Sequence, residues 1–324
     1  MSATIKDVAR LSYVSVATVS RVLNNTGYVH EETKQKILDA IEELNYKPNQ
    51  FARFLTGKKT GIIGVLIPHL RSSFYSEFVD GLEKAFHSND YKLMLASTND
   101  SKMLEKNYID TFKDYNVDGL IIASNILNEE EILNFGKPVV TVDHKISECI
   151  PSLTCDNYNG GKLAAKELMD CGCKNILLLR GPSFLMTTID RTTGFLEGIN
   201  DGVSVETFDF DLVNPDKDII YKHLKNNPKI DGIFATSDIL AIVALSVLNK
   251  VGKSVPEGCK IVGFDNIFMS SLTSPSLTTI EQPITYIGMQ AFNVFNKLIN
   301  KEDITDLHQI LEVNIKKRGS TRID

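Results

Sequence analysis

The sequence predicts an α/β protein with a small helical domain at its N-terminus, a short hinge and a large body of two lobes. The first 47 residues hold two short amphipathic patterns and a longer third one, which indicates three packed helices. From Gly61 onward, apolar runs alternate with amphipathic stretches, which indicates parallel strands joined by helices. Pro48 ends the helical pattern of the first part. We therefore expect a head at 1–47, a hinge at 48–60 and a body at 61–324.

Length and composition are those of an ordinary globular protein. The 324 residues, 43% hydrophobic and 23% charged, are enough for two or three domains of roughly 150 residues each. No stretch approaches the ~18 to 20 apolar residues of a membrane span, and residues 1–30 lack the apolar run of a signal peptide. We expect a cytoplasmic protein without a membrane partner.

The five cysteines form no CxxC cluster and no disulfide framework. They are Cys149, Cys155, Cys171, Cys173 and Cys259. We therefore expect reduced thiols and no metal or other cofactor.

Charge is distributed unevenly along the chain. The formal net charge of −6 argues against a nucleic-acid partner, because phosphate contacts need Lys and Arg. Residues 1–60, however, hold nine Lys and Arg against six Asp and Glu, a net of +3, which leaves −9 for residues 61–324. A basic head on an acidic body is expected when only one part of a protein touches DNA.

Helix signals in the head follow one another closely. Thr4 can cap a helix whose third residue is Asp7, over roughly residues 5–11. Ser15 can cap a second helix after only three intervening residues, a spacing typical of a helix-turn-helix. A third helix begins near Glu31, and its apolar stripe would cover the other two. The spacing of the helix signals alone is equally compatible with a three-helix bundle whose exposed polar residues only face solvent and bind nothing.

Three strings of the head carry a more specific signal. They are TIKDVA at 4–9, VSVATVSRVLN at 14–24 and LNYKPN at 44–49. In this order they closely resemble the DNA-binding head of the LacI/GalR family of bacterial transcription regulators. The resemblance implies a helix-turn-helix whose second helix lies in the major groove of an operator. It also implies a homodimer, because a two-fold operator needs two heads.

The resemblance assigns roles to individual side chains of the head. By position, Val16 and Ala17 would offer apolar contacts to base edges, and Arg21 would supply most of the hydrogen-bonded readout. Hydroxyl groups and nearby amides would hold phosphates. The full set implied for DNA contact is Thr4, Ser15, Val16, Ala17, Thr18, Ser20, Arg21, Asn24 and, in the hinge, Leu55.

Tyr13 departs from the family pattern, which usually has glycine in the turn. A bulky residue at positive φ costs about 1 kcal/mol. Either the turn differs from the family's, or the strain is accepted.

The hinge at 48–60 is too short to be a stable helix alone, so we expect it to fold only on DNA. In the family, paired hinge helices enter the minor groove and a leucine wedges between base steps, a position that Leu55 occupies here. As an ordinary linker, Phe51, Phe54 and Leu55 would instead pack against the body.

The body shows an alternation of strand and helix signals that is too long for one sheet. Apolar runs predict strands at 62–67, 92–96, 117–123, 138–142, 175–179, 230–235 and 260–264. Helical patterns lie near 74–88, 103–115, 158–171, 190–200, 216–226, 238–251 and 285–300. Two Rossmann-like lobes are therefore expected, with a ligand at the carboxyl ends of the strands.

The body also resembles type I periplasmic sugar-binding proteins, to which the sensing domain of the family is related. The resemblance implies an effector-binding and dimerisation domain of two lobes. The N-lobe would comprise about 61–156 and 283–308, and the C-lobe about 157–282 and 309–324.

Residues at strand ends supply the effector-site candidates. They are Ser72, Phe74, Tyr75, Asp143, Arg191, Asp238, Asp265 and Gln282. Carboxylates and Arg can make paired hydrogen bonds to adjacent sugar hydroxyls, and an aromatic face covers the apolar side of the ring. Each residue also has a structural interpretation: a capped turn, a core aromatic or an internal ion pair. Ser72 and His144 stand where ribose-type binders often have Asn and Arg, which weakens the assignment of one sugar.

The function expected from these observations is a repressor of a carbohydrate-utilisation operon that a sugar releases from a palindromic operator. A pentose or a fructose-containing sugar is favoured. The alternative within the family is activation for DNA binding by a corepressor or a phosphorylated protein partner. A transport-type binding protein would need only the body and would not explain the head.

No GxSxG, HExxH or GxxxxGK[ST] motif is found, so we expect no enzyme and no catalytic residues. The sequence ends at Asp324 without leucine heptads, which favours a dimer over a tetramer.

Overall fold

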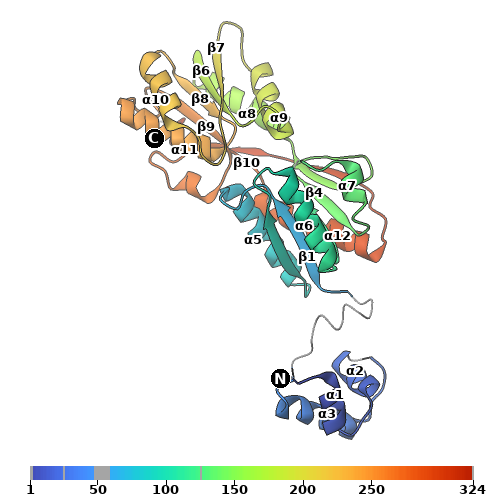
Figure 1. Ribbon diagram of the computed structural model, residues 1–324. Helices are drawn as coiled ribbons and strands as arrows, with labels where there is room; N and C mark the ends of the chain where they lie inside the picture. Colours follow the sequence, from blue (N-terminus) through green and yellow to red (C-terminus); the bar gives the residue numbers. More distant parts are fainter. Residues whose placement is uncertain (1–2, 25, 47–58, 125, 323–324) are drawn as a thin grey trace. The chain divides into compact units, whose positions relative to one another are not determined.

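The computed structural model describes residues 3–24, 26–46, 59–124 and 126–322, without the side chain of Asn24. The chain divides into two compact units, Met1–Thr60 and Gly61–Asp324. Figure 1 shows the helices of the described part of the first unit and the α/β lobes of the second. No helix of the described ranges is long and apolar enough to cross a membrane.

The first unit is the predicted helix-turn-helix head. Its helices are α1 (Ile5–Leu11), α2 (Val16–Asn24) and α3 (Glu31–Glu43). Their inward faces bury a small core, centred on Val8, Val19, Ile37 and Ala40. The three predicted helices are confirmed.

Local polar contacts set the starts of the first two helices. The Asp7 carboxylate accepts hydrogen bonds from the Thr4 backbone N–H at 3.0 Å and from the Thr4 hydroxyl at 2.7 Å. Ser15 Oγ accepts from the Thr18 backbone N–H at 3.1 Å and so caps α2. Tyr13 adopts a φ of 54° in the turn, with its side chain 94% exposed. The structure therefore keeps a left-handed turn residue and accepts the strain of a bulky side chain there.

The first lobe of the body is a six-stranded parallel sheet with helices on both faces. Its strands run in the order β11-β5-β4-β3-β1-β2. They are β1 (Ile62–Ile67), β2 (Lys92–Ser97), β3 (Gly119–Ile122), β4 (Val139–Val142), β5 (Ser152–Cys155) and β11 (His308–Leu311). The helices are α5 (Ser73–His87), α6 (Lys102–Asp114), α7 (Glu129–Leu133) and α12 (Ile284–Asn300). Strands β3 and β4 are buried throughout because helices cover both faces.

The second lobe has a sheet in the order β12-β10-β9-β8-β6-β7, parallel except for the pair β10 and β12. Its strands are β6 (Asn175–Arg180), β7 (Ser204–Asp209), β8 (Gly232–Ala235), β9 (Lys260–Asp265), β10 (Thr278–Glu281) and β12 (Asn314–Lys316). The helices are α8 (Asn157–Asp170), α9 (Met186–Glu197), α10 (Lys217–Asn226), α11 (Asp238–Val251) and the 3₁₀ turn η1 (Phe268–Ser271). The two lobes confirm the predicted α/β architecture of the body.

The chain crosses between the sheets after β5, after β10 and after β11. We predicted the last crossing near 308, but β11 pairs with β5 through Leu311, so the crossing comes three residues later. Strand β7 was also not predicted. It is an edge strand with three exposed and three half-buried residues, so it lacks the buried apolar run of a central strand.

Candidate functional site

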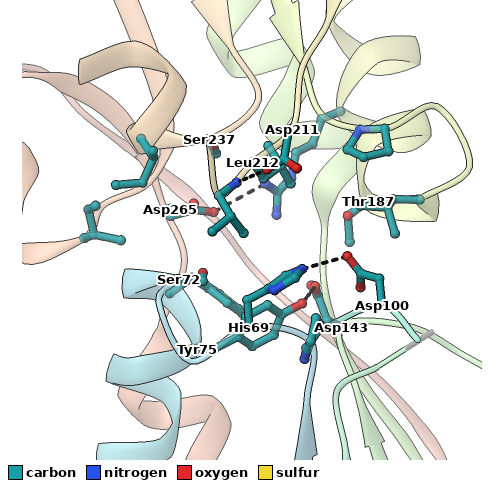
Figure 2. A pocket seen from close by; sticks show the side chains of 18 residues that line it. His69, Ser72, Tyr75, Asp100, Asp143, Thr187, Asp211, Leu212, Ser237 and Asp265 are labelled. Atoms are coloured by element: carbon teal, nitrogen blue, oxygen red, sulfur yellow. Dashed lines mark hydrogen bonds and ion pairs between the residues drawn. The ribbon is translucent and has the colours of Figure 1, made fainter. Parts of the chain in front are cut away.

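A cavity in the second unit lies between the two sheets, at the carboxyl ends of their strands. Its wall comes from the segments that follow β1, β2 and β4 in the first lobe and β6, β7, β8 and β9 in the second. Figure 2 shows His69, Ser72, Tyr75, Asp100 and Asp143 on one side and Thr187, Asp211, Ser237 and Asp265 on the other. The cavity occupies the place at which parallel α/β sheets bind ligands. The predicted effector residues that line it are Ser72, Phe74, Tyr75, Asp143, Arg191 and Asp265.

Asp143 directly follows β4 and adopts a φ of 71°. The Tyr75 hydroxyl donates a hydrogen bond to its Oδ2 at 3.4 Å. Burial holds the pKa of Tyr75 well above its usual value, so the phenol remains a donor. Phe74 meets the Tyr75 ring edge to face, with centroids 5.1 Å apart. This wall thus offers an aromatic pair beside a carboxylate.

Arg191 is held by several partners in the second lobe. Its Nε donates to Asn157 Oδ1 at 2.7 Å, and its Nη1 donates to the Thr236 carbonyl at 2.7 Å and to Asp265 Oδ1 at 3.3 Å. The guanidinium lies 3.8 Å from the centroid of the Phe264 ring. Nη2 donates to no described residue, although Arg191 lines the cavity. A planar fork fixed on one side and open on the other suits a ligand with adjacent acceptors.

Two glycines place Arg191 by letting α8 and α9 approach closely. A Cβ atom on Gly161 of α8 would collide with the carbonyl oxygen of Arg191, and one on Gly194 of α9 would collide with the carbonyl oxygen of Tyr158. The helices therefore pack backbone against backbone where the arginine leaves α9. This packing brings its side chain within reach of Asn157.

Asp265 ends β9 with a φ of 119°. Burial raises the pKa of this carboxyl to about 7, against the opposing effect of Arg191. Gln282 Nε2 donates to Asp265 Oδ1 at 2.7 Å. Gln282 does not line the cavity, and its buried Oε1 has no hydrogen-bond partner among the described residues. The structure thus gives Gln282 a role in holding Asp265, beside one acceptor that is still unsatisfied.

Asp238 lies outside the cavity wall, contrary to its predicted effector contact. It is fully buried, and its carboxylate accepts from the Ile267 backbone N–H at 3.0 Å and from the hydroxyls of Ser270 and Thr279. Burial raises the pKa of Asp238 to about 6, although these three donors lower it. The carboxylate therefore holds η1 and β10 together. The preceding residue, Ser237, lines the cavity instead.

Sequence reasoning missed several polar residues of the cavity wall, among them His69, Asp100 and Asp211. His69 Nε2 and Asp100 Oδ2 are 2.7 Å apart and hydrogen-bonded. Both residues follow predicted strands, so applying the strand-end rule to every strand would have found them. Asp211 follows β7, which carried no clear strand signal.

The charge of the cavity wall favours a neutral ligand. Four carboxyl groups face two basic side chains: Asp100, Asp143, Asp211 and Asp265 against Arg191 and His69. An anionic ligand would meet like charge on both lobes. The described residues contain no group of three or more His, Cys, Asp or Glu arranged to hold a metal ion.

In the first unit, α2 exposes the residues predicted to meet bases. Val16, Ala17 and Arg21 are exposed on one face, while Val19 is fully buried on the other. Thr4 and Ser15 are exposed and Thr18 and Ser20 are half-buried. The side chain of Asn24, and the hinge from 48 to 58 with Leu55, lie outside the described residues.

Comparison with known families matches both units. Residues 4–49 match bacterial regulatory proteins of the lacI family, and residues 60–318 match periplasmic binding proteins and the sugar-binding domain of the LacI family. The chain belongs to the LacI family. This regulator is 36% identical to the ribose operon repressor of Halalkalibacterium halodurans over 322 residues, 98% of this chain and 97% of that protein. It is 34% identical to the sucrose operon repressor of Pediococcus pentosaceus over 295 residues, 89% of this chain and 90% of that protein.

A solved structure extends the likeness of this LacI-family regulator. It is a periplasmic binding protein/LacI transcriptional regulator from Alkaliphilus metalliredigens, complexed with D-xylulofuranose, with a TM-score of 0.74 and 32% identity. The match covers 81% of this chain and all of that one. Family and relatives identify a DNA-binding transcription regulator, which is a non-enzymatic role.

Proposed function

We propose that this LacI-family regulator is a homodimeric repressor of a carbohydrate-utilisation operon and that a small neutral sugar releases it from a palindromic operator. In this proposal, residues 1–47 bind DNA, 48–60 form the hinge, and 61–324 bind the sugar and dimerise. The observation that carries it is the cavity between the lobes, where Arg191 and Asp265 of one lobe face Asp143 of the other. An exposed recognition face on α2 supports the DNA role.

The chemistry of the wall supports a sugar as the effector. Asp143, Arg191 and Asp265 can each bond two neighbouring hydroxyls, and the Phe74 and Tyr75 rings can cover an apolar ring face. Ser72 adds a hydroxyl to the same wall. Relatives are named for ribose and sucrose, and one was solved with D-xylulofuranose. A pentose or a fructose-containing sugar is therefore our proposed effector.

Release follows if the sugar binds one arrangement of the lobes more tightly than the other. A ligand that touches both walls stabilises the closed arrangement by its differential affinity alone. A coupling of about 1 to 3 kcal/mol between sugar and operator gives a five- to 150-fold change in operator affinity. In the head, Arg21 would read base edges with apolar support from Val16 and Ala17. Thr4, Ser15, Thr18, Ser20 and Asn24 would hold the backbone, and Leu55 would wedge the minor groove.

The test is operator binding by the purified full chain at fixed salt, with and without ribose, xylulose, fructose and sucrose. We expect one sugar to weaken binding by at least fivefold, and the Asp265→Asn variant to bind operator equally well but to ignore that sugar. Tighter operator binding with an added compound would support a corepressor. No response to any sugar would overturn the proposal.

A further inference from the structure

Two groups of polar side chains line the same cavity. The inner group is Asp143, Arg191 and Asp265, to which the proposed sugar contacts belong. The outer group is His69 and Asp100 from the first lobe and Asp211 from the second. The outer residues have no role in the proposed contacts, although they belong to the same wall.

Strand order separates the two groups on both lobes. In the first sheet, Asp143 follows β4 and Asp100 follows β2, and strands β3 and β1 lie between these two. In the second sheet, Asp265 ends β9 and Asp211 follows β7, and strands β8 and β6 lie between these two. Three strand spacings place the strand ends about 14 Å apart. Asp265 is influenced by Arg191 and Asp143, and Asp211 by His69, while Tyr75 of the first lobe is influenced by both Asp143 and Asp100, so the two groups lie along one continuous wall.

The outer group keeps polar atoms open. Asp211 Oδ1 accepts hydrogen bonds from the backbone N–H groups of Val213 at 2.6 Å and Asn214 at 2.8 Å, and Oδ2 has no partner among the described residues. These bonds lower the pKa of Asp211, with the one from Asn214 first, so its carboxylate stays ionised. Asp100 uses only Oδ2 for His69, and its Oδ1 and the imidazole Nδ1 likewise bond to no described residue. Open atoms from both lobes match a hydroxyl-bearing ligand placed between them.

We propose that the outer group is a second sugar subsite and that the effector is a molecule of two linked sugar units, one in each group. The inference rests on the proposed function and narrows it. A single furanose or pyranose ring bonded to Asp143, Arg191 and Asp265 is too short to engage the residues that follow β2 and β7. Two linked rings span both positions, with hydroxyls for His69, Asp100 and Asp211.

The test is calorimetric titration of the full chain with sucrose, other glucose–fructose disaccharides, and the monosaccharides fructose, glucose, ribose and xylulose. We expect one disaccharide to bind at least tenfold more tightly than either of its component sugars. His69→Gln and Asp100→Asn should each remove most of that advantage and leave the affinity for the monosaccharide unchanged. Asp303→Asn, at an exposed position outside the cavity wall, is the matched control for loss of one carboxylate.

Other outcomes overturn the inference in distinguishable ways. A monosaccharide that binds as tightly as every disaccharide would remove the outer subsite while leaving the sugar-responsive repressor intact. Variants that weaken all sugars equally would make the His69–Asp100 pair a support of the cavity wall and not a second subsite. Failure of every sugar to bind would overturn the proposed function as well. Melting curves of each variant show whether it is folded, and the comparison of two sugars on one variant is internally controlled.

Discussion

The head and the body of this regulator build their candidate binding surfaces in opposite ways. In the head, the proposed DNA face is one exposed side of α2, and its supporting contacts are local, such as Ser15 with Thr18. In the body, Arg191 contacts Asn157, Thr236 and Asp265, which lie 34 to 74 residues away, and it is 7% exposed. A surface of the first kind can change without altering the fold, whereas one of the second kind is part of the core.

The difference predicts that substitutions on the DNA face of the head lower operator affinity alone, while substitutions in the cavity wall of the body lower sugar affinity and stability together. Because the two surfaces lie in separate units, operator binding without sugar and sugar binding without DNA can be measured separately. The following experiments test that separation in order of expected effect.

Arg191→Met should have the largest effect. Removing the guanidinium leaves buried acceptors of Asn157, Thr236 and Asp265 without their donor, which costs about 1 to 3 kcal/mol of body stability for each. We expect a lower melting temperature by circular dichroism and at least a hundredfold loss of sugar affinity by calorimetry. Arg191→Lys, which keeps the charge and loses the planar fork, should recover more of the stability than of the sugar affinity. Full sugar affinity in Arg191→Met would contradict the assigned site.

Arg21→Ala should weaken operator binding by about 1 to 3 kcal/mol, roughly five- to 150-fold, with no change in sugar affinity or body stability. Fluorescence anisotropy with operator and with scrambled DNA is the measurement. Lys36→Ala on α3 removes the same charge and is the control, since Lys36 is paired with Glu32. Equal losses for both variants, on both DNAs, would mean that Arg21 contributes charge and no base readout.

Sugar affinity should rise about tenfold between pH 6 and pH 8. The pKa of Asp265 is about 7, and only the ionised carboxyl accepts with both oxygens, so the competent fraction grows about tenfold over this range. Because the folded pKa lies above the unfolded one, the unliganded body loses stability as pH rises from about 4 through 7. Titrations at three pH values check the rise, and His69→Gln should preserve it if Asp265 is the group responsible.

Tyr13→Gly should have the smallest effect, a gain of about 1 kcal/mol in head stability, because glycine adopts the φ of 54° without strain. The measurement is thermal unfolding, in which the transition of the head is followed separately from that of the body. Tyr13→Ala removes the exposed ring and keeps the strained conformation, so it should give little of the gain. A gain of the same size in both variants would assign the effect to the ring.

Much of the architecture followed from local patterns. Caps at Thr4 and Ser15 and the apolar stripe of α3 placed the helices of the head, and continuous apolar runs placed strands β1, β2, β3, β4, β6, β8 and β9. The interior strand β5 was not predicted, because polar residues interrupt its short apolar pattern. Apolar runs did not predict the edge strand β7, because half of its residues face solvent. Local patterns did not predict the short strands β11 and β12 either, since these strands pair with segments that are distant in the sequence.

The sequence by itself determined the family, the order of the domains and the positions of strand ends, since caps, turns and hydrophobic periods act over a few residues. Only the tertiary structure decided which polar residues at those ends face the cavity. Ser237 and Asp238 are neighbours after one strand, yet Ser237 lines the cavity, while donors from Ile267, Ser270 and Thr279 hold Asp238 inside the lobe. The physical reason is that a buried carboxylate takes the direction in which donors satisfy it, and here those donors come from 29 to 41 residues farther along the chain.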